Sequence, residues 1–196
     1  MSIADHRREQ IVEGASKAFL QYGYRQTTLD EIARKAEVSR PALYQYFADK
    51  ADIFREVVSR LCDETLLQAR FQLASKADLS QRIAGALRAK YAPVVEQVGR
   101  SPHSAELFDR NARVAGDLAQ ESHAQLEKAI QTELRKAQDQ GRIDLKSRGL
   151  SALAAARLFD QAAQGIVQHA LANPAAWPDQ LVQLVDLMVR GLTPDK

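Results

Sequence analysis

Cysteine is nearly absent from this chain of 196 residues, and the signatures of membrane and secreted proteins are missing. Cys62 is the single cysteine, which excludes an internal disulfide and favours a reducing compartment. The N-terminus, MSIADHRREQ, has no apolar signal segment, and no apolar run is long enough to span a bilayer. The sequence therefore predicts a cytoplasmic protein with no membrane partner.

Motifs for catalysis, phosphate binding and metal binding are also missing. The histidines, His6, His103, His123 and His169, form no Glu-x-x-His or His-x-x-x-His pair. Neither a glycine-rich phosphate loop nor a Gly-x-Ser-x-Gly elbow occurs. Cys62 has apolar neighbours, which are more typical of an inert buried thiol than of a nucleophile. We therefore expect no enzyme, no metal and no cofactor.

Charge of one sign is not in excess. The chain carries 27 Lys and Arg against 25 Asp and Glu, a formal net charge of +2. Basic and acidic residues are also nearly balanced within residues 1–50. Bulk charge therefore neither supports nor excludes nucleic-acid binding, and the local pattern has to decide.

Apolar residues recur at spacings of three and four along most of the chain, which predicts an all-α protein of about nine helices. Three short helices are expected first, over 5–22, from Thr28, and from Ser39 to about Ala48. Six longer ones follow, over 50–73, 80–98, 101–114, 117–139, 147–171 and 178–190. Pro93 should kink or end the fifth helix locally. Gly14, inside the first helix, indicates either close packing or no packing role, and the second interpretation is preferred.

Residues 28–47 hold two short capped helices separated by a tight turn. Thr28 and Glu31 form a capping box, in which each side chain satisfies a backbone N–H at the helix start. Ser39 and Pro41 supply the N-cap and first turn of the second helix. This layout is typical of helix-turn-helix DNA-binding proteins, whose second helix enters the major groove.

The outer face of the second short helix carries side chains that suit duplex DNA. Arg40 can pair with guanine and Gln45 with adenine, and the methyl group of Ala42 can pack on a thymine methyl. The hydroxyl groups of Tyr44 and Tyr46 suit phosphates. The alternative for both tyrosines is that they pack against the first helix.

The same block resembles the N-terminal domain of the tetracycline-repressor (TetR) family of bacterial regulators. The matching residues are Phe19, Gly23, Thr27, Thr28, Ile32, Ala33, Val38, Ser39, Leu43, Tyr44, Tyr46, Phe47 and Lys50. Glu37 departs from the pattern, because the family usually has glycine there. The turn must therefore form without a left-handed glycine or hold Glu37 in a strained conformation.

The resemblance implies a role for each matching position. Positions that read bases in the family hold Arg40, Pro41, Ala42 and Gln45. Positions that bind the DNA backbone hold Thr28, Ser39, Tyr44, Tyr46 and Lys50, so Lys50→Ala is expected to weaken binding to all sequences alike. Leu43 and Phe47 match core positions. Residues 1–50 are thus expected to form the helix-turn-helix DNA-binding domain, and residues 51–196 an effector-binding and dimerisation domain.

Beyond residue 50 the chain resembles the family only in its helical architecture. In the family this region binds a small effector and dimerises through its last two long helices. Here the alanine-rich helix 147–171 permits close approach, and helix 178–190 is apolar over more of its girth than one contact stripe requires. A two-fold interface would bury this excess, and the alternative is a monomer core. Candidate effector-pocket residues are Phe71, Tyr91, Phe108, Asn111, Arg113, His123 and Phe159.

The sequence therefore predicts a homodimeric regulator that binds double-stranded DNA at a near-palindromic operator. The resemblance further implies a repressor that a small-molecule effector releases. The alternative is a helical adaptor of the same fold without DNA binding. Intact groove-facing residues, Arg40, Gln45 and Lys50, favour the regulator.

Overall fold

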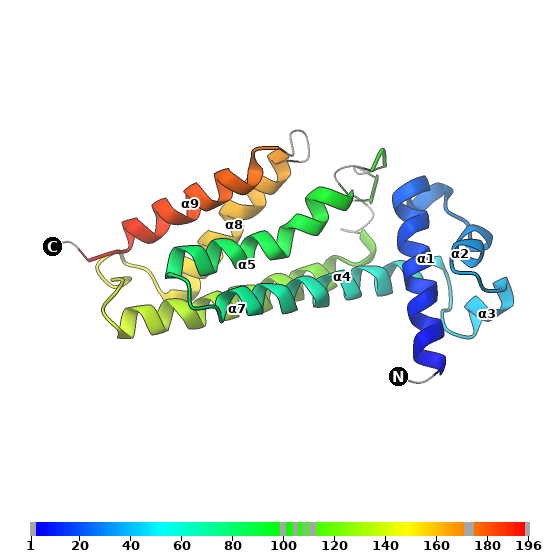
Figure 1. The fold of residues 1–196 in the computed structure, drawn as a ribbon, viewed down its shortest axis with the longest axis horizontal. Helices are drawn as coiled ribbons and strands as arrows, with labels where there is room; N and C mark the ends of the chain where they lie inside the picture. The colour runs from blue at the N-terminus through cyan, green and yellow to red at the C-terminus, as the bar shows by residue number, and fades with distance from the viewer. Residues whose placement is uncertain are drawn as a thin grey trace. The chain divides into compact units, whose positions relative to one another are not determined.

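The computed structural model describes residues 3–98, 101–103, 106–107, 109, 113–170 and 175–194, and every regular element in these ranges is helical (Figure 1). The elements are α1 (Ile3–Gln26), α2 (Leu29–Lys35), α3 (Arg40–Tyr44), α4 (Lys50–Leu73), α5 (Leu79–Pro93), the π-helix η1 (Val94–Val98), α7 (Gly116–Asp139), α8 (Ala152–Ala170) and α9 (Trp177–Gly191). The all-α prediction is confirmed. The helix expected over 101–114 includes residues outside the described ranges.

The chain divides into two compact units. Unit 1 comprises Met1–Cys62 and Gln97–Gln120, and unit 2 comprises Asp63–Glu96 and Glu121–Lys196. Helices α4 and α7 each contribute residues to both units. Among the described helices, none is long and apolar enough to cross a membrane.

Unit 1 is built around a core shared by α1, α2, α3 and the first half of α4. An aromatic cluster lies at its centre: the ring of Phe54 packs edge-on against Phe19 and Tyr24, with centroids 5.2 and 5.1 Å away. Leu43 and Phe47 join the same core, as their match to family core positions implied. Helix α3 is therefore held against the core of unit 1 by its inner side.

Gly14 is the point of closest approach between α1 and the end of α2. A Cβ atom at this position would lie 2.6 Å from the backbone nitrogen of Ala36 and 2.7 Å from its Cα. The interpretation that Gly14 has no packing role is therefore wrong. The contacting residue lies far away in sequence, so helical periodicity alone carries no sign of it.

Unit 2 has its own core, formed by α5, α7, α8, α9 and the second half of α4. Leu87, Leu126, Phe159 and Leu181 are among its fully buried side chains. Helix α9 packs against both α5 and α8. The single tryptophan of the chain, Trp177, is buried in this core and reports on it alone.

Three helix ends differ from the bounds expected from the sequence, and each has a local cause. Helix α5 ends at Pro93 and continues as a π-helix, because proline has no N–H for the helical ladder. Helix α8 begins at Ala152 rather than at 147: Gly149 has φ +65°, and Ser151 Oγ accepts the N–H of Ala154 at 3.1 Å. Helix α3 ends at Tyr44 rather than near Ala48: the N–H groups of Tyr46 and Phe47 both bond to the carbonyl of Leu43, at 3.0 Å each, and close the helix with a turn.

Candidate nucleic-acid interface

The capping box that opens α2 is present as expected. Thr28 Oγ1 accepts the backbone N–H of Glu31 at 3.2 Å, and Glu31 Oε2 accepts the backbone N–H of Thr28 at 2.7 Å. The N-terminal end of α2 is therefore fixed, with the Thr28 side chain exposed beside it.

The turn between α2 and α3 holds Glu37 in the left-handed region, with φ 54°. The N–H of Val38 donates to the carbonyl oxygen of Ala33 at 3.0 Å, and the N–H of Glu37 donates to the carbonyl oxygen of Arg34 at 3.3 Å. These two bonds make a Schellman motif, which usually places glycine at the position of Glu37. Of the two alternatives for this turn, the strained glutamate is confirmed.

Helix α3 turns one face into unit 1 and the other outward. Ser39 Oγ caps the helix by accepting the N–H of Ala42 at 3.3 Å. Leu43 is 1% exposed, whereas Tyr44 is 52% exposed. The outward face therefore presents exposed side chains, which belong to Ser39, Arg40, Pro41, Tyr44 and Gln45.

Tyr46 and Ala42 lie at the edge of this surface, because both are only half-buried. Tyr46 packs against the core of unit 1, which agrees with the packing alternative for this residue. Tyr44 does not join that core and is exposed. The two tyrosines thus have different environments even though they are two positions apart.

Arg40 is exposed and forms an ion pair with an acid of the same unit. Its Nη1 lies 3.0 Å from Asp30 Oδ2 of α2. The hydrogen bond with Tyr44 and the nearby charge of Asp30 raise the pKa of Arg40. The pair uses one of the five guanidinium donors, so a guanine that takes the Nη1 donor would compete with Asp30.

Replacing Asp30 with asparagine is expected to tighten DNA binding about two- to fivefold, because exposed ion pairs of this kind hold weakly. The change frees Arg40 and removes a carboxylate near the phosphates. Fluorescence anisotropy with labelled duplexes at physiological salt measures the effect. Glu13→Gln is the matched control, since it removes an exposed acid of unit 1 that pairs with Lys17 instead. Equal tightening in both variants would contradict a role for the Arg40–Asp30 pair.

Lys50 is directed into the protein. Its ammonium group donates to the carbonyl oxygens of Tyr24 and Thr27, both at 2.8 Å, and to that of Arg25 at 3.4 Å. It also lies 4.5 Å from the centre of the Tyr24 ring. An ammonium has three donors, and all three face the end of α1. The assignment of Lys50 to DNA stays a prediction, and the geometry gives the residue a stabilising role.

The Lys50→Met variant is expected to destabilise unit 1 by about 2 kcal/mol, because three carbonyls lose a charged donor. The salt dependence of DNA binding should remain unchanged. Thermal unfolding and anisotropy at several salt concentrations measure the two effects, with Lys17→Met as the control on α1. A salt slope lowered by about one unit with unchanged stability would instead place Lys50 on a phosphate.

Two candidate effector residues, Tyr91 and His123, meet at a buried carboxylate in unit 2. Asp160, which is 0% exposed, accepts a hydrogen bond from the Tyr91 hydroxyl at 2.7 Å and one from Gln164 at 2.9 Å. His123 Nδ1 lies 3.0 Å from the Oδ2 atom of Asp160. Burial opposes ionisation of Asp160, but the hydrogen bonds from His123 and Tyr91 outweigh it and lower its pKa. Burial and the Asp160 charge raise the pKa of Tyr91.

The other candidate effector residues do not join this cluster directly. Phe159 is buried in the core of unit 2, and Phe71 is 71% exposed on α4. Arg113 belongs to unit 1, where it pairs with Asp109 at 3.1 Å. Phe108 and Asn111 lie outside the described residues. The assignment of an effector pocket to these positions stays a prediction.

Asp160 itself was missed by the sequence reasoning, although a signal was available. It stands in the alanine-rich α8 at helical spacing from Ala156, Ala163 and Val167, all of which are buried. A carboxylate on an apolar stripe indicates a buried polar group, which needs partners. Among the described residues, no group of three or more His, Cys, Asp or Glu could hold a metal ion.

Residues 11–57, which include the helix-turn-helix, match the family described as bacterial regulatory proteins, tetR family. The chain is 38% identical over 85 residues to the HTH-type transcriptional activator FasR of Mycolicibacterium smegmatis, covering 43% of this chain and 39% of FasR. It is 27% identical over 202 residues to the probable acrEF/envCD operon repressor of Escherichia coli K12, covering 96% and 88% of the two chains.

The fold also matches solved structures across most of its length. SmeT, the repressor of the Stenotrophomonas maltophilia multidrug efflux pump SmeDEF, superposes with a TM-score of 0.68 at 19% identity, over 96% of this chain and 91% of SmeT. SmeT has also been solved in complex with triclosan. Among curated relatives, the alignments to FasR, to YhgD of Bacillus subtilis and to HbdR of Aromatoleum span 39%, 63% and 27% of those proteins.

Proposed function

Since the chain belongs to the TetR/AcrR family of DNA-binding transcriptional regulators, we propose that it is a homodimeric repressor with a near-palindromic operator. The observation that carries the proposal is the two-sided α3. Leu43 of the helix and Phe47, three residues beyond it, are buried in the core, whereas Arg40, Tyr44 and the C-cap residue Gln45 are exposed. A helix fixed in this way can enter a major groove without rearranging its own domain.

The proposed DNA contact of each side chain follows from its position. Arg40 and Gln45 read guanine and adenine, and Pro41 and Ala42 contact the bases by apolar surface. Thr28, Ser39, Tyr44 and Tyr46 bind phosphates from either side of the groove. Thr28 and Ser39 stand at the N-terminal ends of α2 and α3, where free backbone N–H groups favour anions.

The dimer is proposed to form through α8 and α9. Three large apolar side chains of these helices are exposed, Leu158, Val182 and Leu187, the last at 68%. Gly165 of α8 has no atom within 4 Å of the place where its Cβ would stand, so a partner helix can approach there. Sedimentation velocity tests this step: Leu187→Glu should give monomers, and Leu67→Glu on α4 should leave the dimer intact.

A small-molecule effector is proposed to release the operator. The triclosan complex of SmeT supports this by analogy, because that relative shares the fold. The effector acts only through its different affinities for the two states of the protein. Repression, rather than activation, is proposed from the efflux-pump and operon repressors among the relatives.

Selection of bound sequences from random duplex DNA, with the full chain at physiological salt, tests the function. We expect enrichment of an inverted repeat with half-sites spaced for two recognition helices on one face of the duplex. Arg40→Ala should lose discrimination at one base pair of each half-site, and Arg135→Ala in unit 2 should not. No enrichment from folded, helical protein would support the adaptor alternative.

A further inference from the structure

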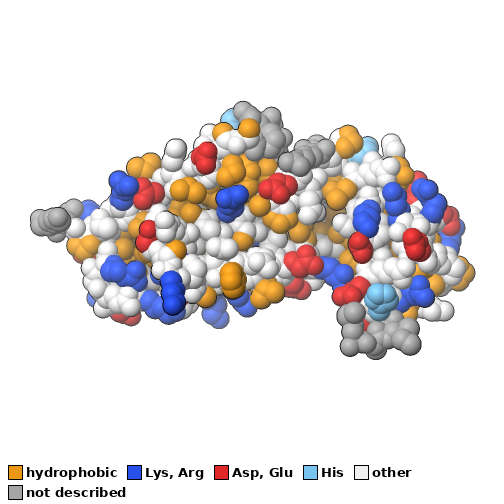
Figure 2. Space-filling model, viewed as in Figure 1, with side chains coloured by type: hydrophobic (Ala, Val, Ile, Leu, Met, Phe, Trp, Pro, Cys, Tyr) orange, Lys and Arg blue, Asp and Glu red, His pale blue; other side chains and the backbone are white. Residues whose placement is uncertain are grey.

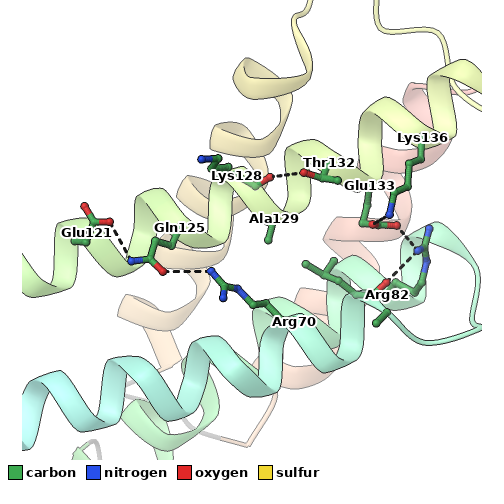
Figure 3. A pocket seen from close by; sticks show the side chains of 11 residues that line it. Arg70, Arg82, Glu121, Gln125, Lys128, Ala129, Thr132, Glu133 and Lys136 are labelled. Carbon is green, nitrogen blue, oxygen red and sulfur yellow. Dashed lines mark hydrogen bonds and ion pairs between the residues drawn. The ribbon is translucent and has the colours of Figure 1, made fainter.

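An open groove of about 820 Å³ runs along unit 2 between the second half of α4 and α7 (Figure 3). Its volume lies within the range of roughly 300–1,000 Å³ that small-molecule sites occupy. Arg70 reaches across it from α4 to Gln125 of α7, and Ala129 points into the gap. We name it the α4–α7 groove, and none of the effector candidates predicted from the sequence lines it.

The carboxylate that closes one end of the groove is already neutralised. Glu133 is buried and receives both Arg82 and Lys136, the second at 2.7 Å. Arg82 also donates to the carbonyl oxygen of Leu73 at 3.0 Å. This end therefore carries one positive charge more than it needs to balance Glu133.

Two further cations of the groove lack an acidic partner among the described residues. Arg70 has only the amide oxygen of Gln125, at 3.3 Å, and Lys128 forms no ion pair. Gln125 in turn donates to Glu121 at 3.0 Å, which is the one carboxylate of the groove without a cation. Figure 2 shows several basic side chains along the lower edge of unit 2, at the left of the view.

Apolar surface accompanies this positive charge. Leu73, Ala74 and Ala129 line the groove itself. Leu67 is 65% exposed on α4, and its spacing of three from Arg70 places both on one face of the helix. Phe71 follows Leu67 by four residues and is also exposed. Large apolar side chains exposed beside unpaired cations are typical of an interaction site rather than of a solvated surface.

We propose that the α4–α7 groove binds a free amphipathic carboxylate, an alkyl chain with a single anionic head group. The head group accepts hydrogen bonds from Arg70 and Lys128. Arg70 thereby exchanges the neutral amide oxygen of Gln125 for a charged acceptor. The alkyl chain lies over Leu73, Ala74 and Ala129 and reaches Leu67 at the rim. A cationic or uncharged amphiphile would cover the same apolar surface but leave both cations unpaired.

Dodecanoate is the probe, titrated below its micelle concentration into the full chain without DNA and followed by calorimetry. Dodecyltrimethylammonium has the same tail with opposite charge, and acetate has the head group without the tail. We expect saturable binding of dodecanoate and none of dodecyltrimethylammonium or acetate. The Arg70→Gln/Lys128→Gln variant should weaken it at least tenfold, because charge-assisted bonds are lost. Thr132→Glu, which adds an exposed negative charge in the groove, should weaken it similarly.

Arg135→Gln is the matched control, since it removes an exposed charge from α7 outside the groove, and should change the affinity less than twofold. Circular dichroism confirms that each variant folds. The proposal is overturned if the double variant binds dodecanoate as well as the parent chain, or if dodecyltrimethylammonium binds equally. Binding to phosphatidylglycerol vesicles without binding of free dodecanoate also overturns it. Because DNA is absent, the outcome is independent of operator binding.

Discussion

The Asp160→Ala variant is expected to lose about 3–5 kcal/mol of stability in unit 2. Asp160 is fully buried and accepts from Tyr91 and Gln164, with His123 at hydrogen-bond distance. Removing the carboxylate leaves these groups without their shared acceptor inside the core, and it leaves a cavity where the side chain stood. Both effects lower the free energy of unfolding of unit 2.

Urea unfolding followed by the fluorescence of Trp177 measures this loss, because the only tryptophan of the chain lies in the core of unit 2. Gln161→Ala is the control on the same helix, one residue along and exposed, and should stay within about 0.5 kcal/mol of the parent. A loss below about 1 kcal/mol for Asp160→Ala would mean that the cluster does not stabilise unit 2.

The pH dependence of the same contribution has a defined sign. The pKa of Asp160 is lower in the folded chain than its ordinary value, which is about 3.9 in an unfolded chain. Its ionised form therefore stabilises the fold at all pH values above about 4. This stability is lost as the pH falls through the lower folded pKa. The difference in unfolding free energy between the parent and Asp160→Asn should accordingly be constant near neutrality and shrink in acid.

The Gly14→Ala variant is expected to destabilise unit 1 by about 2 kcal/mol, against the usual preference of helices for alanine. The new methyl group would stand 2.6 Å from the backbone nitrogen of Ala36. Backbone atoms cannot rotate away as a side chain does. Helices α1 and α2 would have to separate, and the turn that orients α3 would move with α2.

Hydrogen–deuterium exchange of the α1 and α2 amides measures the effect locally, and operator binding should fall with it. Gly116→Ala in α7 is the control, since no atom lies within 4 Å of the place of its Cβ. It should leave exchange in α1 and α2 unchanged. Protection in Gly14→Ala equal to that of the parent chain would show that the helix contact can relax without cost.

Features with a local cause were predictable from the sequence. The capping box of Thr28 and Glu31, the Ser39 cap and the break at Pro93 each depend on neighbours within four residues. The strained turn at Glu37 was also foreseen, because the departure from glycine is visible in the sequence.

Features that depend on distant residues were not predictable in this way. The contact of Gly14 with Ala36 and the three carbonyls that bind Lys50 come from elements separated in sequence. The sequence assigns Lys50 to DNA because it matches a position that binds the DNA backbone in the TetR family. Whether its ammonium points outward or caps α1 depends on the packing of α4, which no local pattern encodes.

The pairing of Arg40 with Asp30 has a consequence for how the protein would search a genome. A base that takes the Nη1 donor of Arg40 would compete with this carboxylate. Only a partner that offers two acceptors, as guanine does, wins that competition clearly. On other sequences the arginine would stay with Asp30 and the protein could slide on. If Arg40 reads guanine as proposed, Asp30 would raise the affinity that a site must offer before the complex becomes long-lived.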